Sequence, residues 1–318
     1  MPDTNCCRSC SADERARVID ILGKPVRIKD YVCSPDGRTY RKKPEKNSVY
    51  LSICPTSLCR GHCAFCVATH TNENRRLNIE AFAGVMKRLK EQDLIHAVKI
   101  TGGEPFDDVG LLNEVIGVLF DTFGFGLTVS ISTNAMRLER LHEVKNLSYV
   151  ETIHVSRHHY DDAVNRAIFG GADVPSGAKL KEIVSTVSYK DLFVFNCMLL
   201  KDHINSPEEA HRMLDFAIET GVPKVGFMTC MPVNAYAQQQ TIPFESVLNE
   251  DDPALLFTRA FYDYEFCHCR DGVYVSPNGS LIEFYGRCTK MDDPGYSRGL
   301  VYDADNHLKL GFSGAIIV

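Results

Sequence analysis

The hydrophobic pattern from about residue 48 onward alternates between two periods. Short apolar runs rich in Val, Ile and Phe are followed by segments whose apolar residues recur at helical spacing, which is typical of βα units on a parallel sheet. Six strands are expected, at residues 48–54, 96–101, 127–133, 151–156, 192–198 and 224–230. Six such units with right-handed crossovers curl into a partial barrel whose chemistry lies at the carboxyl ends of the strands. We therefore predict an α/β fold with a partial (β/α)6 barrel.

The clearest helix signal follows the fifth predicted strand. Ser206 is suited to cap this helix, Pro207 to occupy its first turn, and Glu209 to complete a capping box. The apolar residues that follow form one stripe, and Gly221 ends the pattern. The helix is expected to pack on the outside of the sheet.

The remaining segments lie on either side of the barrel. Residues 1–47 are interpreted as an N-terminal extension, residues 48–250 as the core barrel, and residues 251–318 as a C-terminal extension. Within the last, residues 273–284 surround the turn Pro277-Asn278-Gly279 and predict a β-hairpin. A chain of 318 residues has room for one large domain with appendages or for two smaller domains.

Charge and composition narrow the range of partners. The formal net charge is −6 and no dense run of Lys and Arg occurs, so nucleic acid is not expected as a partner. No apolar stretch approaches the roughly 18 residues that a membrane helix needs, and the N-terminus lacks the apolar core of a signal peptide. A cytoplasmic protein without a membrane partner is therefore expected.

The cysteine content is unusual. Thirteen cysteines occur in a chain without a secretory signal, and an odd count in a reducing compartment does not indicate a disulfide framework. Metal ligation or catalysis is the first interpretation.

A C-x3-C-x2-C motif follows the first predicted strand, with its cysteines at Cys59, Cys63 and Cys66. Three thiolates in one tight loop can hold three corners of a [4Fe–4S] cluster and leave the fourth iron open for an external ligand. The alternatives are a zinc site or buried thiols, but structural zinc takes four ligands, usually as separated pairs. The spacing favours the cluster.

A second motif, Thr101-Gly102-Gly103-Glu104-Pro105, follows the second predicted strand. The two glycines allow close approach of a backbone, and the carboxylate can accept hydrogen bonds from an ammonium group. A Gly-Gly turn alone is weak support. Its place at the strand end beside the cysteine motif is what gives it meaning.

Together the two motifs resemble the radical S-adenosylmethionine (SAM) superfamily over about residues 48–290. The resemblance implies that the methionyl end of SAM chelates the open iron, that SAM is cleaved by one electron from a reductant such as flavodoxin or ferredoxin, and that the resulting carbon radical takes a hydrogen atom from a substrate. It assigns the cluster to Cys59, Cys63 and Cys66 and the cofactor to Gly102, Gly103 and Glu104.

Polar residues at other strand ends resemble further cofactor positions of that family. They are Ser132 and Asn134 after the third strand, Ser156 after the fourth, and Asn196 on the fifth. Phe65, in the cysteine motif, is expected near the adenine. Each polar residue alone is more often a helix cap or turn residue, and their joint placement favours the cofactor role.

The segment Met231-Pro232-Val233 and the late cysteines resemble the molybdopterin-precursor cyclase branch, in which C-terminal cysteines bind an auxiliary cluster. The candidate ligands of a second [4Fe–4S] cluster are Cys267, Cys269 and Cys288, with a fourth from Cys6, Cys7, Cys10 or Cys33. The match is imperfect, because Phe284 stands where a third cysteine would fall. The alternative is that these thiols only pack in the interior.

Other polar and thiol groups near strand ends have open roles. His158 and His159 are either substrate contacts or proton carriers at the mouth of the barrel, or exposed residues at a capped helix start. Cys230 and Cys197 are candidates to return a hydrogen atom to a substrate radical, as in an epimerase. Because side chains alternate along a strand, only one of Asn196 and Cys197 points inward.

Three functions are compatible with these patterns. The first is an enzyme that acts on a small polar metabolite of the carbohydrate, aminoglycoside or nucleotide type. The second is a maturase that modifies a ribosomally made peptide, and the third is a non-catalytic iron–sulfur scaffold. The intact Gly102-Gly103-Glu104 segment argues against the scaffold.

Overall fold

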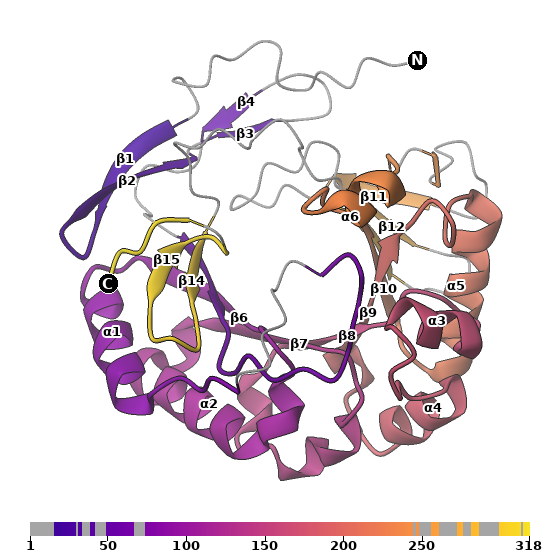
Figure 1. The fold of residues 1–318 in the computed structure, drawn as a ribbon, viewed down its shortest axis with the longest axis horizontal. Helices are drawn as coiled ribbons and strands as arrows, with labels where there is room; N and C mark the ends of the chain where they lie inside the picture. The colour runs from indigo at the N-terminus through magenta and orange to yellow at the C-terminus, as the bar shows by residue number, and fades with distance from the viewer. Residues whose placement is uncertain are drawn as a thin grey trace.

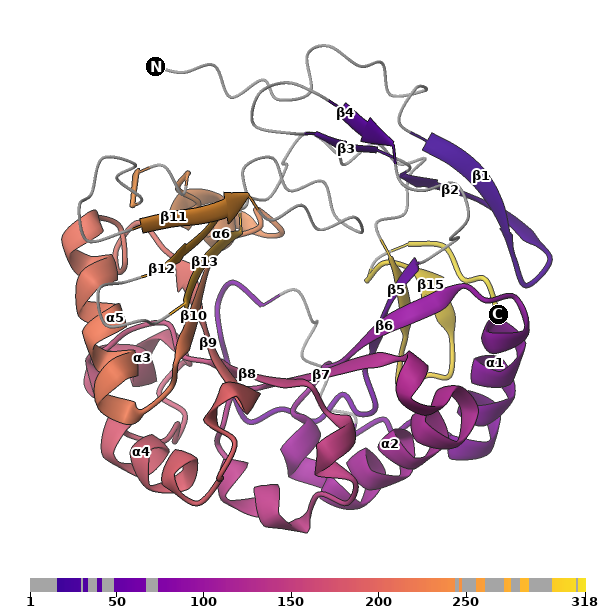
Figure 2. The same cartoon turned by 180° about the vertical axis from the view of Figure 1, so that it is seen from behind.

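A curved and largely parallel sheet lies at the centre of the computed structural model, with helices on its outer side (Figure 1). Figure 2 shows the same arrangement from behind. The residues that the structure describes are 16–29, 31–33, 39–41, 49–66, 74–243, 246–247, 256–260, 272–275, 281–285, 299–312 and 314–318.

The six central strands follow one another across the sheet in chain order, and each pairs in parallel with the next. They are β5 (Val49–Ile53), β6 (Ile95–Ile100), β7 (Thr128–Thr133), β8 (Thr152–Ser156), β9 (Phe193–Leu199) and β10 (Lys224–Thr229). Each differs from its predicted range by at most one residue at either end. The predicted α/β fold with a partial barrel is confirmed.

Strands from the C-terminal part of the chain extend this sheet at both edges. Next to β10 lies β13 (Leu281–Tyr285), in parallel, followed by antiparallel β12 (Gly272–Val275) and β11 (Leu256–Ala260). Next to β5 lies β14 (Leu300–Tyr302), in parallel, followed by antiparallel β15 (Leu308–Leu310). The β12–β13 pair is the predicted late hairpin.

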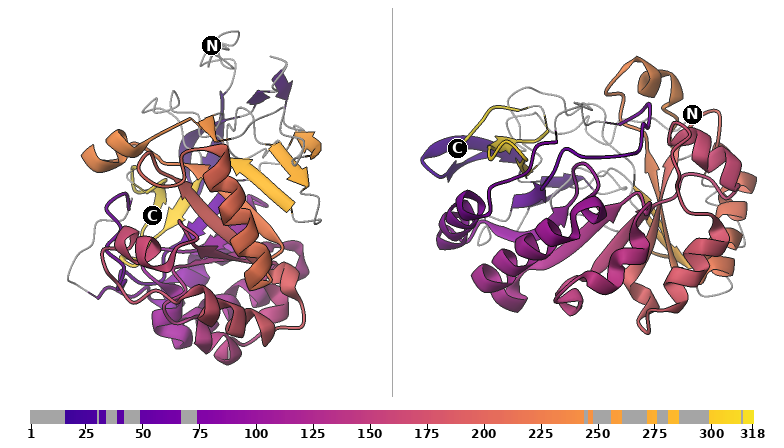
Figure 3. Two further views of the ribbon diagram at one scale, coloured as in Figure 1. Left: turned by 90° about the vertical axis from the view of Figure 1, so that its right-hand side faces the viewer. Right: turned by 60° about the horizontal axis from the view of Figure 1, so that its bottom comes forward.

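Helices follow most of the central strands. They are α1 (Ile79–Glu91), α2 (Val109–Phe123), α3 (Asp162–Ile168), α4 (Gly177–Ser185), α5 (Pro207–Thr220) and α6 (Ala235–Gln240). Short 3-10 helices occur at Pro105–Asp108, Gly124–Gly126, Leu138–Glu143, Leu147–Tyr149 and Lys190–Leu192. Figure 3 shows the helices on the outer side of the curved sheet.

Helix α5 begins at the predicted cap and ends at the predicted glycine, while the carboxylate of Glu209, expected to complete a capping box, accepts from Arg212 at 3.2 Å. The Ser206 hydroxyl accepts a hydrogen bond from the backbone N–H of Glu209 at 3.3 Å, and Gly221 ends the helix with φ +79°. The apolar stripe, Ala210, Met213, Leu214 and Ala217, is buried in the main core. The helix therefore packs on the outside of the sheet, as expected.

The segment that contains α2 is apolar along most of its length. Pro105–Gly126 is long and apolar enough to cross a membrane by length and composition alone, which the sequence patterning above did not indicate. A core helix of a soluble protein meets the same criterion. In this fold Val115, Ile116 and Leu119 of α2 are fully buried in the main core.

Part of the predicted N-terminal extension packs on the barrel. The hairpin of β1 (Ala16–Ile21) and β2 (Lys24–Lys29) buries Ile21 in the main core, and the backbone N–H of Leu22 donates to Gln92 at the end of α1, at 3.1 Å. A second small hairpin pairs β3 (Tyr31–Cys33) with β4 (Thr39–Arg41).

Alternation along the strands divides the sheet into two faces. Val129 and Ile131 of β7 are fully buried in the core under the helices. Because side chains alternate along a strand, Ser132, the residue after Ile131, faces the inside of the barrel. The carboxyl ends of parallel strands meet at the same edge. Polar side chains from successive strands are thereby brought to one region inside the barrel.

Candidate functional site

The loop of residues 59–66, here called the cysteine loop, follows β5 at the carboxyl end of the sheet. Its three cysteines, Cys59, Cys63 and Cys66, are all partly exposed. A tight turn joins the last two, because the backbone N–H of Cys66 donates to the carbonyl of Cys63 at 3.0 Å. The three cysteines therefore remain partly accessible, and the turn keeps Cys63 and Cys66 close in the loop.

Without a bound cation, Cys59 and Cys63 keep their thiols protonated. Burial raises the pKa of Cys59 to about 11, against the lowering effect of a hydrogen bond from the Gly61 backbone. Burial and the negative charges of Cys66 and Cys59 raise the pKa of Cys63 to about 12. A bound metal deprotonates a coordinating thiol outright, so the loop is suited to ligands whose positive charge offsets this cost.

The spread of the sulfur atoms distinguishes a cluster from a single ion. Among the described residues, one group of His, Cys, Asp and Glu side chains has three potential metal-binding atoms within 4.8 Å of one another: Asp303, Asp305 and His307. The carboxylates of this group pair with Lys309 and Arg75, each at 2.7 Å. The sulfur atoms of Cys59, Cys63 and Cys66 do not all lie within 4.8 Å of one another. This disfavours one zinc ion and fits a cluster, in which each thiolate binds a different iron.

The two glycines after β6 are required by close contact with the segment that leads into the cysteine loop. Gly102 has φ +102°, and a Cβ there would lie 2.6 Å from Cys54 Cβ. A Cβ on Gly103 would lie 2.0 Å from the carbonyl oxygen of Leu58, to which the backbone N–H of Glu104 donates at 2.7 Å. The prediction of close backbone approach therefore describes contact with this chain's own backbone, in addition to the expected cofactor.

Glu104 joins the ends of β6 and β7. One carboxylate oxygen accepts from the Thr133 hydroxyl at 2.7 Å and from the Phe106 backbone at 3.0 Å, and the other from the Asn134 backbone at 2.7 Å. The side chain is 1% exposed, and burial raises its pKa to about 7 against these hydrogen bonds. Its contact with the cofactor ammonium stays a prediction, and the structure adds this linking role.

Asn134 brings the end of β7 to the cysteine loop. Its Nδ2 lies 3.6 Å from Cys59 Sγ, while its Oδ1 accepts from the backbone N–H of Met136 at 2.9 Å. The amide is therefore fixed with its NH2 group on the cysteine. Asn134, predicted at a strand end, therefore contacts a proposed cluster ligand.

The cysteine loop also contacts residues that the sequence patterns did not predict as part of the site. The His62 backbone donates to the carbonyl of Phe169 at 3.1 Å, and a Cβ on Gly170, which has φ +70°, would lie 2.8 Å from His62 Cβ. Asn234 donates to the carbonyl of Ala64 at 2.9 Å. The Gly170-Gly171 pair is the sequence signal that would have indicated a close approach here.

Three aromatic rings, those of Phe65, His158 and Phe169, pack against one another beside the cysteine loop and are here called the aromatic wall. The ring of Phe65 meets His158 edge-on at 5.2 Å between centroids, and His158 stacks on Phe169 at 5.2 Å. His158 Nδ1 accepts from the backbone N–H of Met198 at 3.1 Å, and burial lowers its pKa to about 3. His158 is therefore neutral, and this bond leaves its proton on Nε2.

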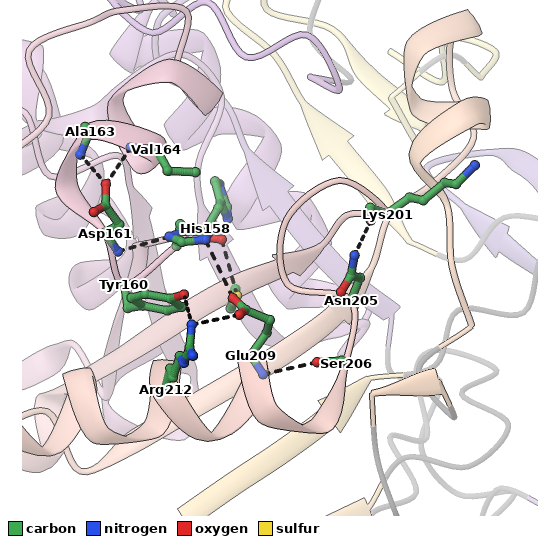
Figure 4. Close-up of polar contacts among 12 residues, drawn as sticks. His158, Tyr160, Asp161, Ala163, Val164, Lys201, Asn205, Ser206, Glu209 and Arg212 are labelled. Atoms are coloured by element: carbon green, nitrogen blue, oxygen red, sulfur yellow. Dashed lines mark hydrogen bonds and ion pairs between the residues drawn. The ribbon is translucent and has the colours of Figure 1, made fainter.

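The loop after β8 contacts α5 through Tyr160 and Arg212 (Figure 4). Asp161 caps α3 by accepting from the backbones of two residues of its first turn, both at 2.9 Å, and Arg212 donates to Tyr160 and Glu209. His159 Nδ1 accepts from the Asp161 backbone at 3.0 Å, and burial lowers the pKa of His159. The predicted capped helix start is present, but both histidines are buried.

Predicted residues on the inner strands lie together. Ser132 is the register partner of His154, and Ser156 is the register partner of Asn196, whose Oδ1 lies 3.2 Å from His154 Nδ1. Cys197 is fully buried in the main core. Of the two alternatives on β9, Asn196 is therefore the inward residue and Cys197 packs under the helices.

The remaining thiols take other positions. Cys230 is 1% exposed in a small apolar cluster with Ile168, Leu200 and Ala237, against which Phe65 packs, and its role as a hydrogen-atom donor stays a prediction. The candidate ligands of a second cluster, Cys267, Cys269 and Cys288, lie outside the described residues, as do Cys6, Cys7 and Cys10. Cys33 ends β3.

Comparison with known proteins gives one family. The model of the Radical SAM superfamily matches residues 53–241, and no curated protein matches the chain. SuiB of Streptococcus suis, bound to the precursor peptide SuiA, is similar at TM-score 0.48 and 19% identity over 61% of this chain and 42% of that one. A radical SAM methyltransferase from Sphaerobacter thermophilus is similar at TM-score 0.47 and 17% identity over 69% and 68%. The chain spans less than half the length of the SuiB structure.

Proposed function

The chain belongs to the radical SAM superfamily, whose model matches residues 53–241, and from this premise we propose that it cleaves SAM reductively at a [4Fe–4S] cluster bound by Cys59, Cys63 and Cys66. The 5′-deoxyadenosyl group so formed takes a hydrogen atom from a small polar metabolite. The electron comes from a reductant such as flavodoxin or ferredoxin.

The observation that carries this proposal is the way in which the cysteine loop is tied to several strand ends at once. The segment that leads into the loop bonds to Glu104 after β6, Cys59 contacts Asn134 after β7, His62 bonds to Phe169, and the Ala64 carbonyl accepts from Asn234. These ties place the cysteines over the inside of the barrel. A loop that served only to bind metal would not need such placement.

The chain's own residues would position the reactants. When bound, the cluster supplies the electron that breaks the bond between the sulfonium and the 5′ carbon of SAM. The hydroxyl and amide groups of Ser156 and Asn196 are suited to orient the cofactor, and the wall of Phe65, His158 and Phe169 excludes water beside the loop. Selectivity for one C–H bond then follows from proximity.

The inner face of the barrel supports a polar substrate. Ser132, His154 and Asn196 face the inside. His154 already bonds to Thr152 and Asn196, so the Ser132 hydroxyl and the Asn196 NH2 group are the groups of this layer that suit the polar groups of a metabolite.

The experiment is anaerobic reconstitution followed by assay of 5′-deoxyadenosine with SAM and dithionite. Cys63→Ala is expected to abolish 5′-deoxyadenosine formation and to lower the iron content, because two thiolates in the loop do not hold a cubane with one open iron. Cys197→Ala is the matched control, since this thiol packs under the helices, and it should retain iron and product. A Cys63→Ala protein with unchanged 5′-deoxyadenosine formation would contradict the proposal.

A further inference from the structure

The turn after β7 fixes the orientation of the Asn134 side chain. Its backbone N–H donates to the Glu104 carboxylate at 2.7 Å, and its Oδ1 accepts from the backbone N–H of Met136 at 2.9 Å. Between them, Ala135 has φ +65° and donates its backbone N–H to the Thr133 hydroxyl at 2.9 Å. Because the carboxamide oxygen faces a donor, the other end of the amide is its NH2 group. The turn therefore presents an N–H donor in one direction.

That donor is aimed at a proposed cluster ligand, since Asn134 Nδ2 lies 3.6 Å from Cys59 Sγ. A Cβ added to Gly61 would lie 3.6 Å from the same sulfur and 3.5 Å from both Met136 Cε and Phe169 Cδ1. Apolar side chains thus lie close to this sulfur. In such surroundings a hydrogen bond is electrostatically stronger than in water.

Two roles are open to this amide. The resemblance to the radical SAM superfamily assigns Asn134 to the cofactor. In the structure its oxygen bonds to Met136 and its NH2 group contacts Cys59, so both ends of the side chain are engaged within the chain itself. A bond to SAM is left to the second hydrogen of the NH2 group. The contact with Cys59 is therefore the role that the geometry supports.

A hydrogen bond to a thiolate ligand acts unequally on the two oxidation states of a cluster. Reduction adds one electron and no proton, so the ligand sulfurs carry more negative charge in the reduced state. An N–H donor stabilises the more negative acceptor more strongly. Hydrogen bonds to the sulfurs are accordingly among the factors that set the reduction potential of an iron–sulfur cluster.

We propose that Asn134 raises the reduction potential of the cluster by donating a hydrogen bond to Cys59. This inference rests on the proposed function and describes the control of its electron-transfer step, in which the reductant supplies the one electron. Asn134 acts through Cys59 and is a positioning residue. Because its backbone bonds to Glu104, the same turn joins the segment expected to bind SAM to a ligand of the cluster.

Two substitutions remove the donor and keep the turn. In Asn134→Ser, the hydroxyl can accept from the backbone N–H two residues on, as the Asn oxygen does in this turn, and it is too short to reach Cys59. Asn134→Asp keeps the acceptor for Met136 and turns a carboxylate oxygen toward the sulfur in place of the N–H group. The serine variant loses the hydrogen bond alone, and the aspartate variant adds a repelling charge.

The test measures the midpoint potential of the full reconstituted chain by anaerobic redox titration without SAM. At a fixed solution potential, Asn134→Ser should lower the ratio of reduced to oxidised cluster about three- to tenfold, which is about 30 to 60 mV for one electron. Asn134→Asp should lower it further. Iron content and SAM affinity are measured on the same samples.

Asn113→Ser is the matched control. Asn113 of α2 also uses both ends of its amide, because its NH2 group donates to the Glu143 carbonyl at 3.0 Å and its oxygen accepts from the Lys145 backbone at 2.7 Å. Its loss should leave the potential unchanged. Asn134→Thr offers the same hydroxyl as serine and provides a second uncharged variant if Asn134→Ser fails to fold.

Unchanged potentials in the Asn134 variants with full iron content would overturn the inference. A weaker affinity for SAM at unchanged potential would do so too, because the amide would then act on the cofactor. Folded variants that all lacked a cluster would reduce Asn134 to a support of the loop, which also contradicts the inference. The proposed function is judged separately, by 5′-deoxyadenosine formation in the original chain. A cluster that titrates without cleaving SAM counts against that function and leaves the potentials readable, whereas an original chain without a cluster overturns both.

Discussion

The two flanks of the cysteine loop are held by different means. On the β6–β7 flank, backbone lies directly on backbone at Gly103, and the buried carboxylate of Glu104 joins the two strand ends. The β8–β10 flank also has a backbone bond, from His62 to Phe169, and adds side-chain contacts through the ring of His158 and the amide of Asn234. A backbone contact cannot relax around an added atom, whereas side-chain packing yields in steps. Substitution at the backbone contact of Gly103 should therefore fail abruptly, and substitution of His158 or Asn234 gradually.

The largest effect is expected from Gly103→Ala. The added methyl group would lie 2.0 Å from the Leu58 carbonyl oxygen, so the entry to the cysteine loop must move. We expect destabilisation above about 4 kcal/mol, in the rare tail of point substitutions, and loss of iron after reconstitution. Thermal unfolding and iron content measure the two effects.

Gly117→Ala is the matched control for that substitution. Gly117 lies inside α2 with nothing within 4 Å of an added Cβ, so Ala there should stabilise the chain by about 0.5–1 kcal/mol. Equal and small effects of the two substitutions would remove the distinction between the flanks.

The second prediction concerns the pH dependence that Glu104 produces. Burial raises its pKa from 4.5 to about 7 in the folded chain, so between these values the folded state binds more protons than the unfolded state. Stability from this group is then fully present below about pH 4.5 and is lost as the pH rises through 7, by on the order of 3 kcal/mol. Glu104→Gln should flatten this slope.

The slope is measured by denaturant unfolding of the cluster-free chain from pH 4.5 to 8, for the original sequence and for Glu104→Gln. Glu139→Gln, on the surface of a 3-10 helix, is the control and should leave the slope unchanged. Identical slopes in all three proteins would show that the pKa of Glu104 is not raised in the folded chain, and this prediction would then be wrong.

The fold and the β6–β7 flank were predictable from sequence because their signals are local. Strand periodicity gave all six central strands, and two adjacent glycines indicated a tight approach after β6. The contacts of the second flank were not predicted, because Phe169 and Asn234 lie 107 and 170 positions along the chain from the residues they contact, His62 and Ala64. Contacts that close loops of this length leave no periodic signal in either partner.

The same reason explains what was missed about the histidines. A pair of adjacent histidines beyond a strand end is typical of an accessible, titrating site. Here His158 stacks on Phe169 and accepts from the Met198 backbone, so burial by distant residues decides its protonation. The pairing of β14 with β5 was not predictable either, because the two strands lie far apart in the sequence.

The third prediction tests the side-chain flank at His158. His158→Phe keeps an aromatic ring but leaves the Met198 backbone N–H without the acceptor that it has at 3.1 Å. The expected cost is about 1–3 kcal/mol, with the cluster retained. His158→Asn, whose Oδ1 can take the place of Nδ1, should recover part of this stability. If His158→Phe also abolished iron binding, the second flank would be as intolerant as the first.

The smallest effect is expected at Asn234, where one side chain has two separable roles. Its Oδ1 caps α6 by accepting from the Ala237 backbone at 2.8 Å, and its Nδ2 donates to the Ala64 carbonyl in the cysteine loop at 2.9 Å. Asn234→Asp keeps the cap, since Asp caps as well as Asn, and removes the bond to the loop. Asn234→Ala removes both.

For Asn234→Asp we expect at most about 1 kcal/mol of lost stability but a few-fold faster loss of iron to a chelator, because only the hold on the cysteine loop is weakened. Asn234→Ala should add about 1 kcal/mol for the lost cap without a further increase in the rate of iron loss. The two rates separate the cap from the loop contact. If iron loss followed overall stability in both variants, Asn234 would act through α6, and the β8–β10 flank would hold the loop through its aromatic packing and the bond from His62 to Phe169.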